Sequence, residues 1–287
     1  MQVERHTEVD SFLGHAGEFL LEREAEHNLT LGLCAHLRRD PRLYGDDPYF
    51  AVALEDGSVV ATALRTPPHN LVLSEIDDLR ALEPLGDDVG AAFDALPGVL
   101  GPTEAAACFA HTWEARTGTH ARIELNQRIY RAEEAIAPEG VDGRMRPFAE
   151  DDHGLVVGWL DAFVAEALPA APPDDSESML RHRQRDPEGG IVIWEDGEPV
   201  SFAGFGGPTP NGIRIGPVYT PPELRRRGYA SALTAELTRI LLGDDRRFCF
   251  LFTDLSNPTS NTIYQRIGYR PVTDVDLWVF GHTAYHP

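Results

Sequence analysis

The sequence predicts an α/β protein in which one series of strands and helices occurs twice. Residues 213–220 alternate apolar and polar side chains as a β-strand does, and residues 230–241 then repeat apolar side chains at helical spacing. A Glu-Asp-Gly turn joins two strand-like runs in each half, at 55–57 and again at 195–197. Further strand and helix patterns follow each turn at matching distances, which indicates two similar halves in tandem.

The first half begins with a helical stretch. Residues 8–40 carry an apolar stripe at helical spacing, and Pro41 ends it. After Pro41 the apolar period changes to that of strands, with prolines and glycines between the runs. Strands are predicted at 49–54, 58–64 and 71–76, a helix at 103–116 and a closing strand at 121–130.

The second half repeats this order after a linker rich in proline and glycine. The linker is placed at 135–143, so residues 1–134 and 144–287 are expected to be separate domains. Glycines end the last helix of each half, Gly118 in the first and Gly268 in the second. The predicted strands are 144–148, 191–194, 199–205, 213–220 and 248–253, and the predicted helices are 151–168, 176–185 and the segments that begin near 229 and 257.

Between the strand at 213–220 and the next helix lies a stretch suited to binding an anion. Two prolines stop the strand, and Arg225, Arg226, Arg227 and Gly228 follow them. Free N–H groups at a helix start carry partial positive charge and bind phosphate, and the arginines add full charges beside them. We call residues 225–230 the cradle and predict that it holds a phosphate or pyrophosphate group.

These residues resemble the GCN5-related N-acetyltransferase (GNAT) superfamily. Its pyrophosphate loop reads Arg/Gln-x-x-Gly-x-Gly/Ala, which stands here as Arg225-x-x-Gly228-x-Ala230. A later stretch, from Asn257 through Tyr264 to Gly268 and Tyr269, resembles the family's helix after its fifth strand, with Ser260 in place of the usual alanine. The two motifs occur in the right order, and the resemblance covers roughly residues 143–281.

The resemblance implies both a fold and an activity. The expected fold is α/β, of the α+β GNAT type, with a mixed, mostly antiparallel central sheet flanked by helices and two GNAT-like domains in tandem. The expected activity is N-acetyl transfer from acetyl-CoA, as co-substrate, directly to an amine of a small molecule or peptide. The sequence leaves open an alternative, a protein that binds acyl-CoA without turnover and acts as a sensor or interaction module.

The resemblance also implies site residues. Tyr264 matches the tyrosine that can protonate the departing thiolate, and its alternative role is to anchor the helix on the sheet. The implied coenzyme ligands are Val218 and Tyr219 for the pantetheine arm, Arg225, Arg226, Arg227, Gly228, Tyr229 and Ala230 for the pyrophosphate, and Asn257 and Asn261 from the following helix.

Two parts of the chemistry stay open at this point. Glu166, Glu195 and Asp254 are the nearest candidates for a general base, but each such residue is more often a solvated or turn-stabilising acid, and water can take the proton instead. The acceptor is not revealed. Its candidate walls, which could equally be core or turn, are Trp159, Phe163 and Glu166 on one side and Phe202, Phe205 and residues 208–212 on the other.

The first half lacks the residues that bind phosphate. At the position of the cradle it carries Pro84-Leu-Gly-Asp87-Asp88-Val-Gly90, in which no arginine occurs and two acids would repel a pyrophosphate. We therefore expect residues 1–134 to be a degenerate GNAT-like domain without a coenzyme site, with a structural role.

Composition and net charge argue against several kinds of partner and bound group. A formal charge of −21 argues against nucleic acid or an anionic membrane as a partner, and it suits either a cationic acceptor or solubility alone. The three cysteines are far apart in apolar contexts, and no histidine has ligand spacing, so neither a disulfide nor a metal site is expected. The expected location is the cytoplasm. A homodimer is compatible with the sequence, which leaves the oligomeric state open.

Overall fold

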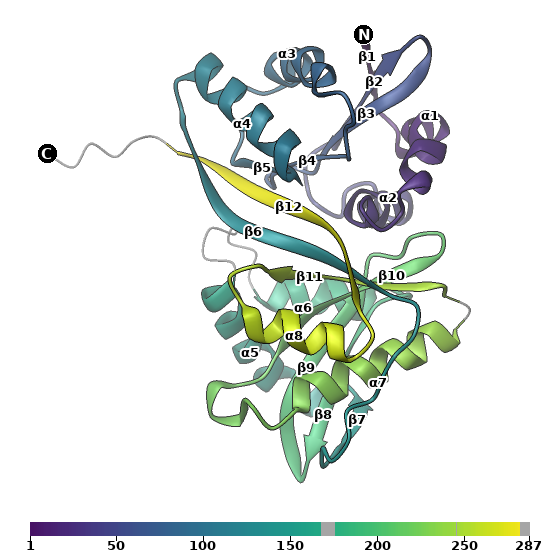
Figure 1. Cartoon of the computed structure of the whole chain (residues 1–287), viewed down its shortest axis with the longest axis vertical. Coiled ribbons are helices and arrows are strands. Elements are labelled where there is room, and N and C mark those ends of the chain that lie inside the picture. The colour runs from purple at the N-terminus through teal and green to yellow at the C-terminus, as the bar shows by residue number, and fades with distance from the viewer. Residues whose placement is uncertain (168–175, 245, 282–287) are drawn as a thin grey trace, which may run out of the picture. The chain divides into compact units, whose positions relative to one another are not determined.

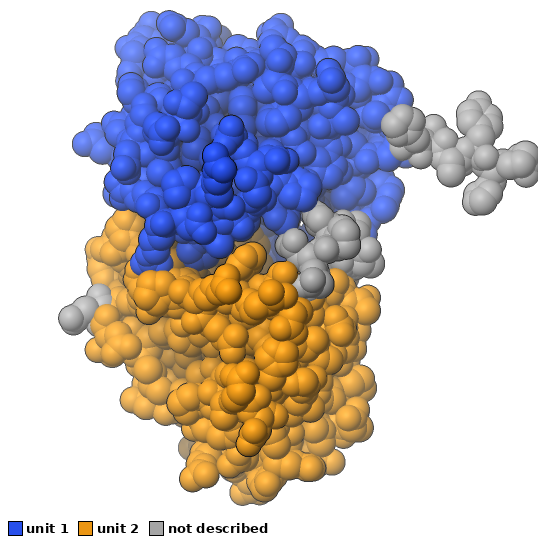
Figure 2. All heavy atoms as spheres, turned by 180° about the vertical axis from the view of Figure 1, so that it is seen from behind, with its two compact units in different colours: residues 1–128, 273–287 blue, residues 129–272 orange. Residues whose placement is uncertain are grey.

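The computed structural model describes residues 1–167, 176–244 and 246–281 (Figure 1). The chain forms two compact units, shown in different colours in Figure 2. Unit 1 comprises residues 1–128 and 273–287, and unit 2 comprises residues 129–272.

These units are divided differently from the domains expected from the sequence. The expected linker, residues 135–143, lies inside unit 2, and the chain enters and leaves that unit within strands. Assignment of domains to 1–134 and 144–287 therefore stays a prediction, separate from the compact units.

Unit 1 is an open sheet with helices on both faces. Its strands are ordered β1-β2-β3-β4-β5-β12-β6, antiparallel except for the parallel pair β4 and β5. Its elements are β1 (Gln2–His6), α1 (Val9–Glu22), α2 (Asn28–Arg39), β2 (Tyr49–Glu55), β3 (Ser58–Arg65), β4 (Leu71–Leu73), the 3₁₀ turn η1 (Leu79–Ala81), α3 (Leu82–Ala92), β5 (Gly98–Pro102), α4 (Thr103–Thr117), and parts of β6 (His120–Ala132) and β12 (Arg270–Gly281).

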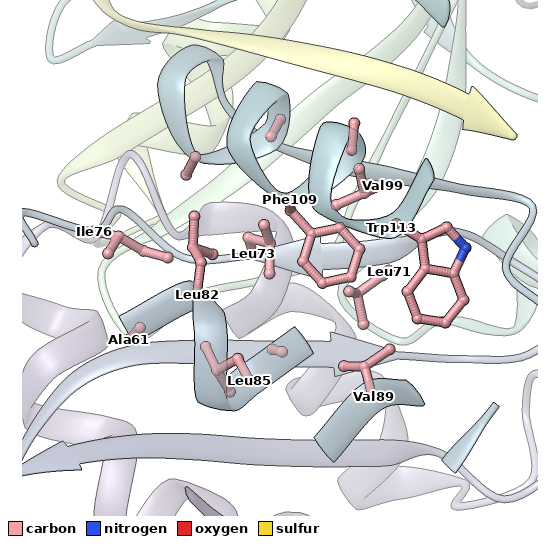
Figure 3. Packing of buried hydrophobic residues seen from close by; sticks show 14 of the residues in the cluster. Ala61, Leu71, Leu73, Ile76, Leu82, Leu85, Val89, Val99, Phe109 and Trp113 are labelled. Atoms are coloured by element: carbon pink, nitrogen blue, oxygen red, sulfur yellow. The ribbon is translucent and has the colours of Figure 1, made fainter. Parts of the chain in front are cut away.

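The two faces of this sheet bury different helices because strand side chains alternate. On β2, Phe50 and Val52 pack with α1 and α2, whereas Ala51 and Ala53 belong to the core under α3 and α4. Figure 3 shows the second core, in which Leu82, Leu85 and Val89 of α3 and Phe109 and Trp113 of α4 gather with Leu71, Leu73 and Val99 of the sheet.

Unit 2 repeats this architecture. Its strands are ordered β6-β11-β10-β9-β8-β7, and the parallel pair is β10 and β11. Its elements are the end of β6, β7 (Arg144–Pro147), η2 (Glu150–Asp152), α5 (His153–Ala167), α6 (Ser176–Arg185), β8 (Gly190–Asp196), β9 (Glu198–Gly206), β10 (Gly212–Tyr219), η3 (Pro222–Leu224), α7 (Tyr229–Gly243), β11 (Phe248–Asp254), α8 (Pro258–Arg266) and the start of β12.

Alternation again separates two cores in unit 2. Ile191 and Ile193 of β8 pack with α5 and α6, whereas Val192 and Trp194 of the same strand pack with α7. Helix α8 lies on the α7 side, because Tyr264 contacts the core that α7 covers. The parallel strands β10 and β11 and helix α7 therefore pack against each other through this core, and the cradle lies between β10 and α7 in sequence.

The closing strand of each half pairs outside its own half. β6, which follows α4, lies beside β11 in unit 2, and its residues Tyr130 and Ala132 are buried in the unit 2 core. β12, which follows α8, pairs antiparallel with β5 of unit 1, from Val275–Pro102 to Val279–Gly98. The two halves of the sequence have thus exchanged their last strands.

Most predicted elements are present, but several differ. Residues 8–40 form two helices, β4 is shorter than predicted, and β1 was not predicted. The stretch 84–90, taken as the counterpart of the cradle, lies inside α3, because its apolar side chains face the core and its acids pair, Asp88 with Arg5 and Tyr49, and Asp87 with Arg116. The predicted end of the helix 151–168, Leu168, lies outside the described residues.

Candidate functional site

Strands β10 and β11 separate part-way along their length. Their registered pairs are Gly212–Phe248, Ile213–Cys249 and Arg214–Phe250, and the pairing stops there although both strands continue. From Ile215 to Tyr219, the edge of β10 next to β11 has no strand partner among the described residues. Unpaired backbone groups at a strand edge are ready to bind an extended ligand.

A bulge lies where the pairing ends. The register of β10 with β9 shifts between Ile215 and Val218, so Gly216 and Pro217 are the interrupting residues. Proline has no N–H group to donate to a ladder, and glycine accepts the unusual backbone angle found at Gly216, φ +150°. Beyond the bulge Val218 and Tyr219 pair with β9, so these predicted ligands lie on the separated part of β10.

The start of α7 lies after this strand and carries free backbone donors. Its N-cap is Gly228, which has no side chain to cap the helix, and the N–H of Ala232 bonds to the carbonyl of Gly228. The N–H groups of Tyr229, Ala230 and Ser231 precede that bond and have no carbonyl one turn earlier within the helix. They form a site of partial positive charge, as the sequence predicted.

The three arginines of the cradle differ in their surroundings. Arg225 bonds through Nε to the carbonyl of Thr220 (2.8 Å) and through Nη2 to Glu166 (2.7 Å). Arg226 and Arg227 are exposed and form no ion pair with any described residue. Arg226 and Arg227 therefore supply the available positive charge, and Arg225 holds the cradle to α5.

Gly228 and Tyr229 are held by neighbouring side chains. Gly228 has φ +89°, and a Cβ atom there would lie 2.7 Å from Cγ2 of Val141. Tyr229 is buried and its hydroxyl donates to Asp196 (2.6 Å), a bond that raises the pKa of Tyr229. These two residues therefore offer only backbone groups to a ligand, and their binding of an anion stays a prediction.

The predicted asparagines of α8 make bonds within the protein. Asn257 is the N-cap of α8, and its Oδ1 accepts from the N–H of Ser260 (3.0 Å). Asn261 donates through Nδ2 to the carbonyls of Asp254 (2.9 Å) and Asn257 (2.8 Å). Both therefore fix the connection from β11 to α8, and a contact with coenzyme stays a prediction.

Tyr264 lies on α8, half-buried against the α7 core. Its ring meets Tyr269 edge-on at 6.0 Å between centroids. Burial raises its pKa to about 12, and its hydroxyl makes no hydrogen bond to the described part of the chain. The group is therefore protonated at neutral pH and able to donate a proton, as the proposed acid must be.

The three candidate bases are engaged elsewhere. Glu166 accepts a hydrogen bond from the guanidinium of Arg225, and its Oε1 lies 3.3 Å from the hydroxyl of Tyr219. Glu195 pairs with Arg146 and Arg144, which lowers its pKa and weakens it as a base. Asp254 accepts from the N–H of Ser256 (2.7 Å), as a turn-stabilising acid does. None of these contacts identifies a base, so the choice between a side chain and water stays open.

Several candidate walls of the acceptor site are core residues. Phe202 is fully buried, and Trp159 stacks on it at 6.1 Å between ring centroids. Phe163 packs in the same core, while Phe205 closes over Gly190. These side chains of α5 and β9 thus pack inside unit 2, and an acceptor pocket lined by them stays a prediction.

A comparison with known protein families identifies part of unit 2. Residues 145–269 match the family model described as the acetyltransferase (GNAT) family. This segment is a GNAT domain. It contains the separated strands, the cradle and α8, but it begins after β6 and ends before β12. A search of curated protein sequences found no significant match.

Solved structures extend the likeness of fold beyond the GNAT domain. A GNAT protein from Sphaerobacter thermophilus is 20% identical, with 96% of this chain and 94% of that chain covered and a TM-score of 0.56. One from Kribbella flavida is 22% identical, covering 78% and 89%, with a TM-score of 0.53. A tandem GNAT protein of the clavulanic acid pathway is 11% identical, covering 96% and 98%, with a TM-score of 0.55. The chain therefore has the fold of a tandem GNAT protein.

Two features of the site were not predicted from the sequence. The bulge at Gly216 and Pro217 had a visible signal, a glycine and proline inside a strand pattern. Tyr130, whose hydroxyl donates to Asn261 (3.0 Å), had none, because it lies 131 residues away in sequence. Within the described residues, no group of acids, histidines and cysteines could hold a metal ion, and no helix is long and apolar enough to cross a membrane.

Proposed function

We propose that this chain transfers an acetyl group from acetyl-CoA to an amine of a small molecule or peptide. The observation that carries the proposal is the separation of β10 from β11 beyond Arg214, directly before the uncapped start of α7. An open strand edge followed by free helix-start donors suits a ligand with an amide-bearing arm and a pyrophosphate at one end.

The residues present fit coenzyme A. The edge of β10 at Val218 and Tyr219 would bind the pantetheine arm through backbone groups. The N–H groups at the start of α7 would bind the pyrophosphate, with Arg226 and Arg227 as the nearby cations. Arg225 is instead committed to Glu166 and Thr220, so we expect it to shape the cradle more than to contact phosphate.

Acetyl-CoA supplies a thioester that an amine can attack without a covalent enzyme intermediate. Backbone N–H groups on the open edge of β10 would polarise its carbonyl oxygen. Tyr264 would hold a proton at Oη, available where negative charge develops on the leaving sulfur. A phenol is protonated at neutral pH, and burial raises the pKa of Tyr264 further, to about 12, so the hydroxyl carries its proton in this site.

Unit 1 is expected to have no coenzyme site of its own. Its counterpart of the cradle is the continuous run from η1 into α3, where Arg80 pairs with Asp78, Asp88 with Arg5 and Asp87 with Arg116. No exposed arginine pair like Arg226 and Arg227 occurs there. One coenzyme per chain is therefore expected.

Calorimetric titration with acetyl-CoA tests the proposal, followed by mass spectrometry of amine panels. Binding of one equivalent, weakened by Arg226→Ala with Arg227→Ala, is the expected result. Arg122→Ala is a matched control, since Arg122 is an exposed arginine of unit 1 that pairs with Glu124. Absence of binding at high micromolar concentration would refute the proposal. Binding without acetylation of any amine would favour the sensor instead.

A further inference from the structure

Tyr130 lies outside the GNAT segment in sequence but bonds to the helix that carries Tyr264. It is on β6, and its side chain is fully buried in the unit 2 core. Its hydroxyl donates to Oδ1 of Asn261 (3.0 Å) and accepts from Nε2 of Gln265 (3.1 Å). The hydroxyl thus uses its donor and an acceptor on residues of α8.

Asn261 carries this constraint to the loop before α8. The carbonyls of Asp254 and Asn257 can only accept, so the amide nitrogen of Asn261 faces the loop and donates to them (2.9 Å and 2.8 Å). The amide oxygen of Asn261 then accepts from the hydroxyl of Tyr130 (3.0 Å). Asn261 therefore ties the start of α8 to the end of β11, and the hydroxyl of Tyr130 ties Asn261 to β6.

Tyr264 lies between the two partners of Tyr130 in sequence. Asn261 is three residues before it, and Gln265 follows it directly. The hydroxyl of Tyr264 makes no hydrogen bond to the described residues. Its position is therefore determined by the placement of α8 and by the packing of its ring, because no bond of its own holds it.

We propose that Tyr130 is a positioning residue for acetyl transfer, whose hydroxyl places α8, and thereby Tyr264, through Asn261 and Gln265. This inference rests on the proposed function. It gives the strand that precedes the GNAT segment a direct part in the site.

The test compares Tyr130→Phe with two other variants of the full chain. Tyr130→Phe keeps the ring and removes only the hydroxyl. Tyr49→Phe is the matched control, because Tyr49 is a buried tyrosine of unit 1 whose hydroxyl donates to Asp88 (2.6 Å). Gln265→Leu removes the second bond of Tyr130 from an exposed side chain, without a change in the core.

The first measurement is hydrogen exchange by mass spectrometry on the free protein. In Tyr130→Phe, exchange of the backbone amides of residues 258–269 should rise about tenfold, since Asn261 keeps a partly buried acceptor without its donor. Gln265→Leu should give a smaller rise in the same peptides. Tyr49→Phe should leave them unchanged. Equal exchange of α8 in Tyr130→Phe and the natural protein would overturn the proposal.

The second measurement is thiol release from acetyl-CoA, with water or an identified amine as acceptor. Tyr130→Phe should lower kcat by about tenfold and leave the Kd for acetyl-CoA within about twofold, because Tyr264 acts only as charge develops on sulfur. In a Tyr264→Phe background, the same change should have little further effect on kcat. A normal kcat, or an equal loss in that background, would overturn the proposal.

The outcome for the natural protein separates the two claims. If it neither binds nor turns over acetyl-CoA, the proposed function fails and the role in catalysis falls with it. Hydrogen exchange still reports whether Tyr130 holds α8. If the natural protein is active but Tyr130→Phe has a normal kcat and normal exchange of α8, the positioning role fails and the proposed function stands.

Discussion

Replacement of Gly228 by alanine should destabilise unit 2 for two separable reasons. Gly228 has φ +89°, a conformation that costs an L-residue about 1–2 kcal/mol. The new Cβ would also lie 2.7 Å from Cγ2 of Val141, which is closer than such atoms approach, so α7 or Val141 must shift. We expect a total loss of about 2–3 kcal/mol, with the steric part amounting to about 1 kcal/mol.

The assay is urea denaturation of the full chain, followed by tryptophan fluorescence, since Trp194 belongs to the unit 2 core. Gly228→Ala is measured alone and in a Val141→Ala background, where the contact is relieved. The loss caused by Gly228→Ala should be about 1 kcal/mol smaller in that background, leaving the conformational part. Equal losses in both backgrounds would show that the contact with Val141 is irrelevant. No loss in either would refute the whole argument.

Three further predictions follow from the site and from unit 1. Tyr264→Phe should lower kcat by roughly 10²–10⁴-fold with an unchanged Kd for acetyl-CoA, measured by steady-state kinetics and calorimetry; a normal rate would make Tyr264 an anchor only. A fragment of residues 144–287 should be poorly folded by circular dichroism, because it lacks Tyr130 and the rest of β6; a stable, fully active fragment would contradict this. His27 is buried and its pKa is lowered to about 4 from 6.5. Between pH 4 and pH 6.5 the unfolded chain therefore binds a proton at His27 that the folded chain does not. The free energy of unfolding should fall by about 3 kcal/mol as the pH drops from 6.5 to 4. His27→Gln should reduce this fall, which is measured by unfolding the protein at a series of pH values. The same slope in that variant would exclude His27 as its source.

Elements with strong local signals could be predicted from the sequence. The Glu-Asp-Gly turns form as expected, with Asp56 at φ 52° and Gly57 at φ 82°, because these residues tolerate positive φ. Gly118 ends α4 in the left-handed conformation, as a C-terminal glycine does. The helix start after Gly228 could be predicted because its signals lie in one continuous stretch of sequence, whereas its binding of a phosphate stays a prediction.

Features that depend on distant residues could not be predicted. The acids of α3 suggested a loop, but Asp88 is held by Arg5 and Tyr49, and such pairing is invisible in a local pattern. The partner of Arg225, Glu166, was considered as a base, because sequence does not show which cation lies beside a carboxylate. The sequence also did not show that β6 lies beside β11 or that β12 pairs with β5. A strand pattern specifies which face is buried but not which strand lies next to it.

The exchange of closing strands bears on how this chain matures on the ribosome. β12 (Arg270–Gly281) is made long after β5 (Gly98–Pro102), yet it covers the edge of β5. At the usual pace of translation, the edge of β5 waits about 10–30 s for its partner. An open strand edge is a site of aggregation, so the nascent chain has a defined period of vulnerability. Truncations that remove β12 would leave the edge of β5 uncovered permanently. The resulting aggregation would start from a strand that is made much earlier than the truncated segment.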